Sequence, residues 1–268
     1  HKIGGFALSQ TSPIIIYVYT TLTVVALYGN YMLIVMGVQT LMTAMFNSMN
    51  AGIGNLVAEG DKRKIMSVFA ELFSIRFLFS CIMCFGVLMI TPAFVSFWIG
   101  KKYVMDSLSL LLMTAILFVN LSRTTVDAYI NAYGLFGDIW APIVEASLNV
   151  GLSIILGYYF GLHGVLSGVL ISLLLVVFCW KPYYLFRKGL DERLSIYIFM
   201  YARHLMAALL CGVIVCLGMR YSMVQGDTTF FDGLLGILVF SILSTLTLLC
   251  VAPGMRNLMR RFIRMCHV

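Results

Sequence analysis

The stretch FLFSCIMCFGVLMITPAFVSFWI, residues 77–99, contains no charged residue, and it decides the fold class. Because a helix rises 1.5 Å per residue, about 20 apolar residues cross the ~30 Å hydrocarbon core of a membrane. A second uncharged run extends from Leu234 to Ala252. The strands of an outer-membrane barrel would instead alternate apolar and polar residues. These runs therefore predict an all-α, polytopic transmembrane helix bundle.

The composition of the whole chain also favours a membrane protein. Of its 268 residues, 61% are hydrophobic and only 11% are charged, whereas soluble domains carry about 25% charged residues. A soluble fold could hold such an apolar excess only by exposing large apolar patches to water. A disordered chain needs the opposite balance of charge and hydrophobicity. We therefore exclude an ordinary cytosolic enzyme, a nucleic-acid-binding protein and a disordered chain.

About eight apolar segments are long enough to cross a membrane. Short runs of Gly, Asn or charged residues separate them, such as Tyr28-Gly29-Asn30 and Gly161-Leu162-His163-Gly164. The expected spans are 3–27, 31–58, 65–99, 104–133, 139–160, 165–180, 195–220 and 233–252. A basic tail (255–268) follows the last span, and we expect the chain to be the C-terminal portion of a longer protein.

The positions of the 18 Lys and Arg residues predict how the spans are oriented. If the chain crosses eight times, both of its termini lie on one side, and twelve of these residues lie there, against three on the other side. Short cytoplasmic loops are enriched in Lys and Arg, so we expect the first side, called the basic side below, to be cytoplasmic. Its cationic residues are Lys2, Lys62, Arg63, Lys64, Lys181, Arg187, Lys188, Arg193, Arg256, Arg260, Arg261 and Arg264.

Four glycines surround the expected turn near residue 161. Gly157 and Gly161 are four residues apart, as are Gly164 and Gly168. Small residues at this spacing let membrane helices approach closely, but glycines also flank tight turns. Both interpretations stay open at this point.

Five of the ionisable residues inside the expected spans stand out: Glu71, Arg76, Arg123, Asp127 and Glu145. Charges in hydrocarbon are costly, so each is a candidate for function. From the helical rise, all five lie roughly 9–15 Å from the basic side, on three consecutive spans. They predict a shared polar patch that faces a cavity. The alternative is a structural network of ion pairs that joins the helices.

Asparagines on neighbouring spans extend this candidate site. Asn47 and Asn131 are candidates for contact with a polar ligand, although such residues also form hydrogen bonds between helices. No pattern predicts a catalytic triad, a set of metal ligands or a phosphate-binding loop. We therefore expect neither an enzyme nor a bound metal or cofactor.

Several motifs resemble those of a known transporter family. The clearest runs from Asp127 to Phe136 and continues through 138–142 to Glu145 and Asn149; shorter ones are 25–31, 46–48, 54–60 and 180–183. Over roughly positions 3–187, they resemble O-antigen and capsule flippases of the multidrug/oligosaccharidyl-lipid/polysaccharide exporter superfamily. The resemblance implies the six-helix C-terminal lobe (1–187) of a two-lobed transporter in a bacterial inner membrane, followed by two additional transmembrane helices (188–254).

The resemblance also implies a substrate. It is an oligosaccharide linked to a polyprenyl diphosphate, which passes from the inner to the outer leaflet during biosynthesis of a surface polysaccharide such as O-antigen. Glycan polymerase and assembly proteins are candidate partners. Arg123 and Arg76 would contact the diphosphate, because arginine recognises phosphate through its forked geometry. Asp127, Glu71 and Glu145 would orient the arginines or bind a coupling cation.

Two other functions remain open. A drug/cation antiporter of the same superfamily would favour carboxylates over arginines in its cavity. A non-transporting scaffold of a polysaccharide assembly complex would pair all its intramembrane charges and have no open cavity. The flippase hypothesis requires the arginines to face a cavity.

Overall fold

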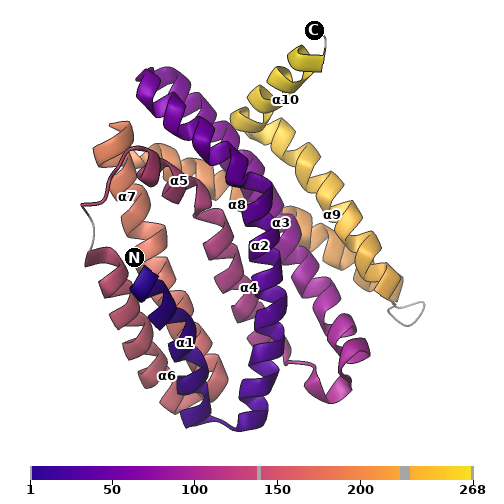
Figure 1. Ribbon diagram of the computed structural model, residues 1–268. Coiled ribbons are helices and arrows are strands. Elements are labelled where there is room, and N and C mark those ends of the chain that lie inside the picture. Colours follow the sequence, from indigo (N-terminus) through magenta and orange to yellow (C-terminus); the bar gives the residue numbers. More distant parts are fainter. Residues whose placement is uncertain (1, 138–139, 224–229, 267–268) are drawn as a thin grey trace.

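In a computed structural model, residues 2–137, 140–223 and 230–266 are described, and their regular secondary structure is entirely helical (Figure 1). The predicted all-α bundle is therefore confirmed. The longer helices are α1 (Lys2–Tyr19), α2 (Leu22–Glu59), α3 (Lys62–Trp98), α4 (Ser107–Ser122), α5 (Thr124–Ala132), α6 (Trp140–Leu173), α8 (Leu194–Met223), α9 (Phe230–Val251) and α10 (Pro253–Cys266). Shorter elements are a 3₁₀ turn (Lys101–Tyr103), α7 (Lys181–Leu185) and two π-helical stretches (Leu174–Trp180 and Phe186–Leu190).

Six helical segments among the described residues are long and apolar enough to cross a membrane. They are Leu22–Glu59, Lys62–Trp98, Ser107–Ala132, Trp140–Leu190, Leu194–Met219 and Phe231–Val251. The fourth, 51 residues long, contains two arms because α6 folds back on itself. Helix α1 lies against α6 (Figure 1). The chain is thus a multi-pass helical membrane protein.

The hairpin within α6 explains the glycines around residue 161. Gly161 has φ 56° and ψ −130°, a conformation that only glycine adopts easily, and it reverses the chain. A Cβ atom at Gly164 would lie 1.9 Å from the carbonyl oxygen of Leu156, and one at Gly168 would lie 2.6 Å from the backbone nitrogen of Ser153. Both interpretations of these glycines therefore hold: one makes the turn, and others let the two arms approach closely.

The first turn lies earlier than the sequence predicts. The chain leaves α1 after Tyr19 and enters α2 at Leu22, so the prediction of a turn at 28–30 is wrong. Residues 28–30 lie within a continuous helix. Within a bilayer no water competes for backbone hydrogen bonds, so Gly and Asn interrupt a helix less readily than they do in water.

Helix α3 lies at the centre of the bundle and contacts α2, α4, α5, α8, α9 and α10. Its aromatic residues form a buried face against α8: the ring centres of Phe73 and Tyr197 are 5.7 Å apart, and those of Phe77 and Tyr201 are 5.3 Å apart. The two helices expected to be additional, α8 and α9, are therefore built onto the centre of the bundle. Hollows lie on different sides of α3, and the candidate site is in one of them.

Candidate functional site

A cavity of about 380 Å³ lies between α2, α4 and α5, with α3 behind it. We call it the polar cavity because amide and charged side chains form much of its wall. The polar and charged residues that line it are Gln39, Thr43, Asn47, Asn50, Arg76, Asn120, Arg123, Thr124, Asp127 and Asn131. Five of the seven predicted site residues thus meet here: Asn47, Arg76, Arg123, Asp127 and Asn131.

Arg76 is the most deeply buried charge at the cavity, with only 2% of its surface exposed. Its Nη1 donates to the carbonyl oxygen of Thr124 and its Nη2 donates to Oδ1 of Asn50, each at 3.0 Å. The guanidinium carbon lies 5.3 Å from the centre of the Phe46 ring. Dipoles and an aromatic face therefore hold this cation.

No carboxylate neutralises Arg76 among the residues that the structure describes. Its Nε atom is buried and has no hydrogen-bond partner. Buried cations are normally paired, and buried N–H groups normally have an acceptor. Arg76 thus brings to the cavity wall a positive charge that no described carboxylate balances, which suits an anionic ligand.

Arg123 occupies a bend between two helices. The single span expected over 104–133 is present as Ser107–Ala132, with a bend at Arg123 where α4 ends at Ser122 and α5 begins at Thr124. Nε of Arg123 lies 3.2 Å from Oδ2 of Asp127, and Nη1 lies 3.9 Å from Oε1 of Glu145. The side chain remains 29% exposed. Unlike Arg76, Arg123 is balanced by carboxylates and still open to the cavity.

Lys181 also belongs to the ion-pair network of Arg123 and Asp127. The sequence predicted that Lys181 lies in a loop on the basic side. Its Nζ donates to Oδ1 of Asp127 at 2.8 Å, and its side chain is 18% exposed. The helical path continues beyond Trp180 to Leu190, which carries Lys181 alongside α5. The large apolar residues that follow Lys181 are untypical of a loop, and they were the feature of the sequence that indicated a longer helix. Asp127 is therefore held between two cations.

Glu145 projects from α6 into a neighbouring hollow of about 330 Å³, which also borders Arg123, Asn149 and Ser12. Only 7% of Glu145 is exposed. Arg123 lines both hollows. It therefore connects Glu145 to the polar cavity, although Glu145 does not line that cavity itself.

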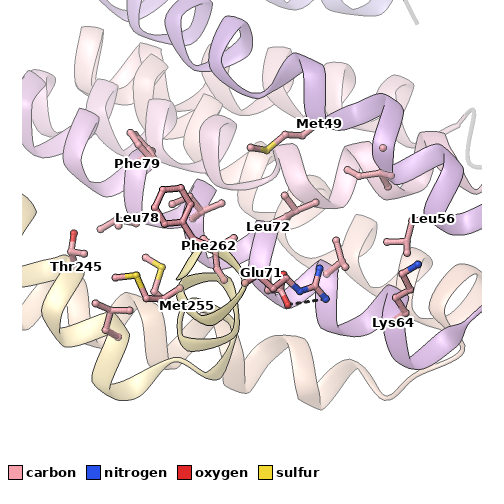
Figure 2. A pocket seen from close by; sticks show the side chains of 18 of the residues that line it. Met49, Leu56, Lys64, Glu71, Leu72, Leu78, Phe79, Thr245, Met255 and Phe262 are labelled. Carbon is pink, nitrogen blue, oxygen red and sulfur yellow. Dashed lines mark ion pairs between the residues drawn. The ribbon is translucent and has the colours of Figure 1, made fainter. Parts of the chain in front are cut away.

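Glu71 does not join the other predicted site residues. It faces a groove of about 890 Å³ between α2, α3, α9 and α10, where Oε1 lies 3.4 Å from Nη2 of Arg261 and accepts a hydrogen bond from Ser67 at 3.1 Å. Figure 2 shows this ion pair among apolar side chains. Residues 71 and 76 differ by five positions, which places them about 140° apart around a helix. Helical geometry thus divides the shared patch that the sequence predicted.

We call this second hollow the apolar groove. Carbon-rich side chains from all four helices form most of its surface, including Leu72, Leu78, Phe79, Leu249, Leu258 and Phe262 (Figure 2). The carboxylate of Glu71 is neutralised there by α10. The ion pair therefore has a structural explanation: it attaches α10 to α3.

No protein family, curated protein or solved structure matches this chain. The geometry of the site and the resemblance of its motifs therefore carry the functional interpretation.

Proposed function

We propose that this chain takes part in moving an oligosaccharide, linked to a polyprenyl diphosphate, across the bacterial inner membrane during biosynthesis of a surface polysaccharide. The observation that carries the proposal is Arg76, a buried guanidinium in the wall of a polar cavity that has no carboxylate partner among the described residues. A guanidinium binds phosphate through parallel charge-assisted hydrogen bonds. Arg123, at the same cavity, would supply a second contact.

The remaining wall of the polar cavity suits a sugar. Each Asn or Gln side chain offers both donors and acceptors, which match the hydroxyl groups of a glycan. Asn47 and Asn131 face the cavity from α2 and α5. A volume of about 380 Å³ is typical of a pocket for a small ligand. We infer that the cavity holds the diphosphate and the adjoining sugar at one stage of translocation, while the polyprenyl chain stays in lipid.

The contacts of the carboxylates argue against an antiporter. Such a transporter needs a carboxylate that is free to bind a proton or a cation. Asp127 is held by Arg123 and Lys181, and Glu145 lies near Arg123. A scaffold would have no use for an unpaired buried cation, which costs several kcal/mol unless something compensates it. Both alternatives therefore fit the charges less well than a flippase does.

A bacterial strain that lacks its own flippase provides the test. Supplied with the full-length protein, it should display surface glycan, and Arg76→Gln should reduce the display at least about tenfold because charge-assisted contacts are lost. Arg123→Ala should reduce it in the same direction. Arg260→Gln is the matched control, since this exposed arginine of α10 lines neither the polar cavity nor the apolar groove.

Membrane levels of each variant are measured in parallel, so that loss of protein is separated from loss of transport. Undiminished glycan with Arg76→Gln would remove this residue from the mechanism and, with it, the main support for the proposal. Drug resistance without any glycan display would favour the antiporter.

A further inference from the structure

A third hollow, of about 850 Å³, lies at the basic side, where the first turns of α3, α8 and α10 meet. We call it the interfacial pocket. It is separate from the polar cavity, and it is built on the face of α3 that carries Ala70. A Cβ atom at Gly254 would lie 2.3 Å from the carbonyl oxygen of Ala70. The first turn of α10 is thus fixed directly against α3 and forms a firm wall of this pocket.

Arg203 is a cation of this pocket that the transport proposal does not use. It lies nine residues beyond the first residue of α8, inside a membrane-spanning segment. Its guanidinium carbon lies 5.9 Å from the centre of the Phe199 ring, which is one helical turn nearer the start of α8. The side chain therefore reaches back towards the basic side, as long cationic side chains do in membranes.

The guanidinium of Arg203 has unused hydrogen-bonding capacity. Its Nε atom is buried and has no hydrogen-bond partner. Among the described residues, neither Arg203 nor Arg63 forms an ion pair. Lys62, also at this pocket, is already paired with Asp191 at 2.9 Å. Two uncompensated cations therefore share one pocket.

The rest of the pocket wall has two chemical characters. Ser195 and Asn257 supply neutral hydrogen-bonding groups, and Glu192 is the one acidic residue among those that line the described pocket. Met66, Phe199 and Met200 supply an apolar surface. A ligand that satisfies both parts carries a negative head and a hydrocarbon chain.

We propose that the interfacial pocket binds an anionic glycerophospholipid of the surrounding membrane. Its phosphate contacts Arg203 and Arg63, and one acyl chain lies along Phe199 and Met200. Basic pockets between transmembrane helices on the cytoplasmic side are suited to such head groups. The bound lipid would join α8 and α10 to α3. This inference does not depend on the transport proposal, because none of these residues lines the polar cavity.

Native mass spectrometry of the purified full chain tests the inference. Dioleoyl phosphatidylglycerol and dioleoyl phosphatidylcholine are titrated separately into the detergent-solubilised protein. The wild-type chain should bind phosphatidylglycerol at least about fivefold more tightly, and Arg203→Gln should weaken that binding about fivefold, the change expected for one interfacial arginine. Arg63→Gln should act in the same direction, and because Arg63 is exposed its replacement leaves the fold intact.

Arg260→Gln is the matched control, since it removes an equal charge from the same side outside the pocket. If it weakens phosphatidylglycerol binding as much as Arg203→Gln does, the attraction is general and the pocket is not a site. Unchanged binding with both Arg203→Gln and Arg63→Gln also overturns the proposal. Displacement of the lipid by an equal concentration of glycerol 3-phosphate would show a site for free phosphate instead of a lipid. Arg203→Lys, which keeps the charge, should retain most of the binding.

Discussion

The polar cavity and the apolar groove receive opposite charges from the same helix. Arg76 reaches the polar cavity, where amides and backbone carbonyls surround it without a carboxylate partner among the described residues. Glu71 reaches the apolar groove, where Arg261 neutralises it. A charge within a membrane therefore does not by itself mark a functional site. Whether a partner already compensates that charge distinguishes a candidate ligand contact from a structural link.

This difference has an energetic basis. Removing an ion from water costs several kcal/mol, and a well-placed counter-ion returns much of that cost. Glu71 has such a counter-ion, whereas Arg76 relies on dipoles and on the Phe46 ring. Arg76 would therefore stabilise an anionic ligand in the polar cavity. Glu71 offers no such attraction to a ligand in the apolar groove, because Arg261 already neutralises it.

Lys181→Met gives the largest effect in this comparison, because it removes one of the two cations that hold Asp127. Among the described residues, Asp127 would then keep Arg123 as its one ion-pair partner. We expect the free energy of unfolding to fall by about 1–2 kcal/mol and surface glycan to decrease. Unfolding in bicelles and the strain described above measure the two effects. Lys188→Met is the control, since Lys188 is exposed and lines neither the polar cavity nor the apolar groove. An equal loss of stability and glycan with Lys188→Met would show that only the total charge matters.

Glu71→Gln gives a smaller effect and probes the apolar groove. The amide can still accept from Ser67, but Arg261 loses its ionic partner. Because a buried charge is removed together with its ion pair, we expect stability to change by less than about 1 kcal/mol. Amide hydrogen exchange should become several-fold faster in α10, while surface glycan stays at the wild-type level. A loss of glycan as large as that of Arg76→Gln would place Glu71 in the transport site after all.

His163→Leu gives the smallest effect, because His163 lines neither the polar cavity nor the apolar groove. Nε2 of His163 lies 2.8 Å from Oδ2 of Asp106, next to the start of α4. Partial burial raises the pKa of Asp106, but hydrogen bonds with His163 and the backbone N–H of Ser109 outweigh it and lower the pKa to about 2. The substitution should move this pKa towards the usual value of 3.8.

The sign of the pH effect follows from this lowered pKa. The carboxylate of Asp106 contributes stability above the unfolded-state pKa, near 3.8, and the contribution is lost as pH falls towards about 2. The variant should therefore be slightly less stable than the wild type at neutral pH and equal to it once Asp106 is protonated in both. Solvent screens this half-exposed pair, so the difference is small. A ¹³C NMR titration of the Asp106 carboxyl measures the pKa, and an unchanged value would contradict the assignment.

Particular residues show how far the sequence could predict the site. Arg123 and Asp127 are four positions apart, so their contact follows from helical geometry, and the structure contains it. The separation of Glu71 from Arg76 also follows from the helical period, although depth alone suggested a shared patch. The contact of Lys181 with Asp127 joins residues 54 positions apart, and no local pattern indicates such a pair. The bonds from Arg76 to the backbone of Thr124 and to Asn50 also join residues far apart in sequence, by 48 and 26 positions.

The sequence alone determined that the chain forms membrane-crossing helices, because the length of an apolar run and the low content of charge are local properties. It also indicated the reversal at Gly161. The tertiary structure decided which charges meet, where α4 bends at Arg123, and that hollows of different character flank α3. These features depend on how each helix is rotated about its axis and which neighbours it contacts. That rotation is set by side-chain fit along whole helices, which residue spacing within one segment does not specify.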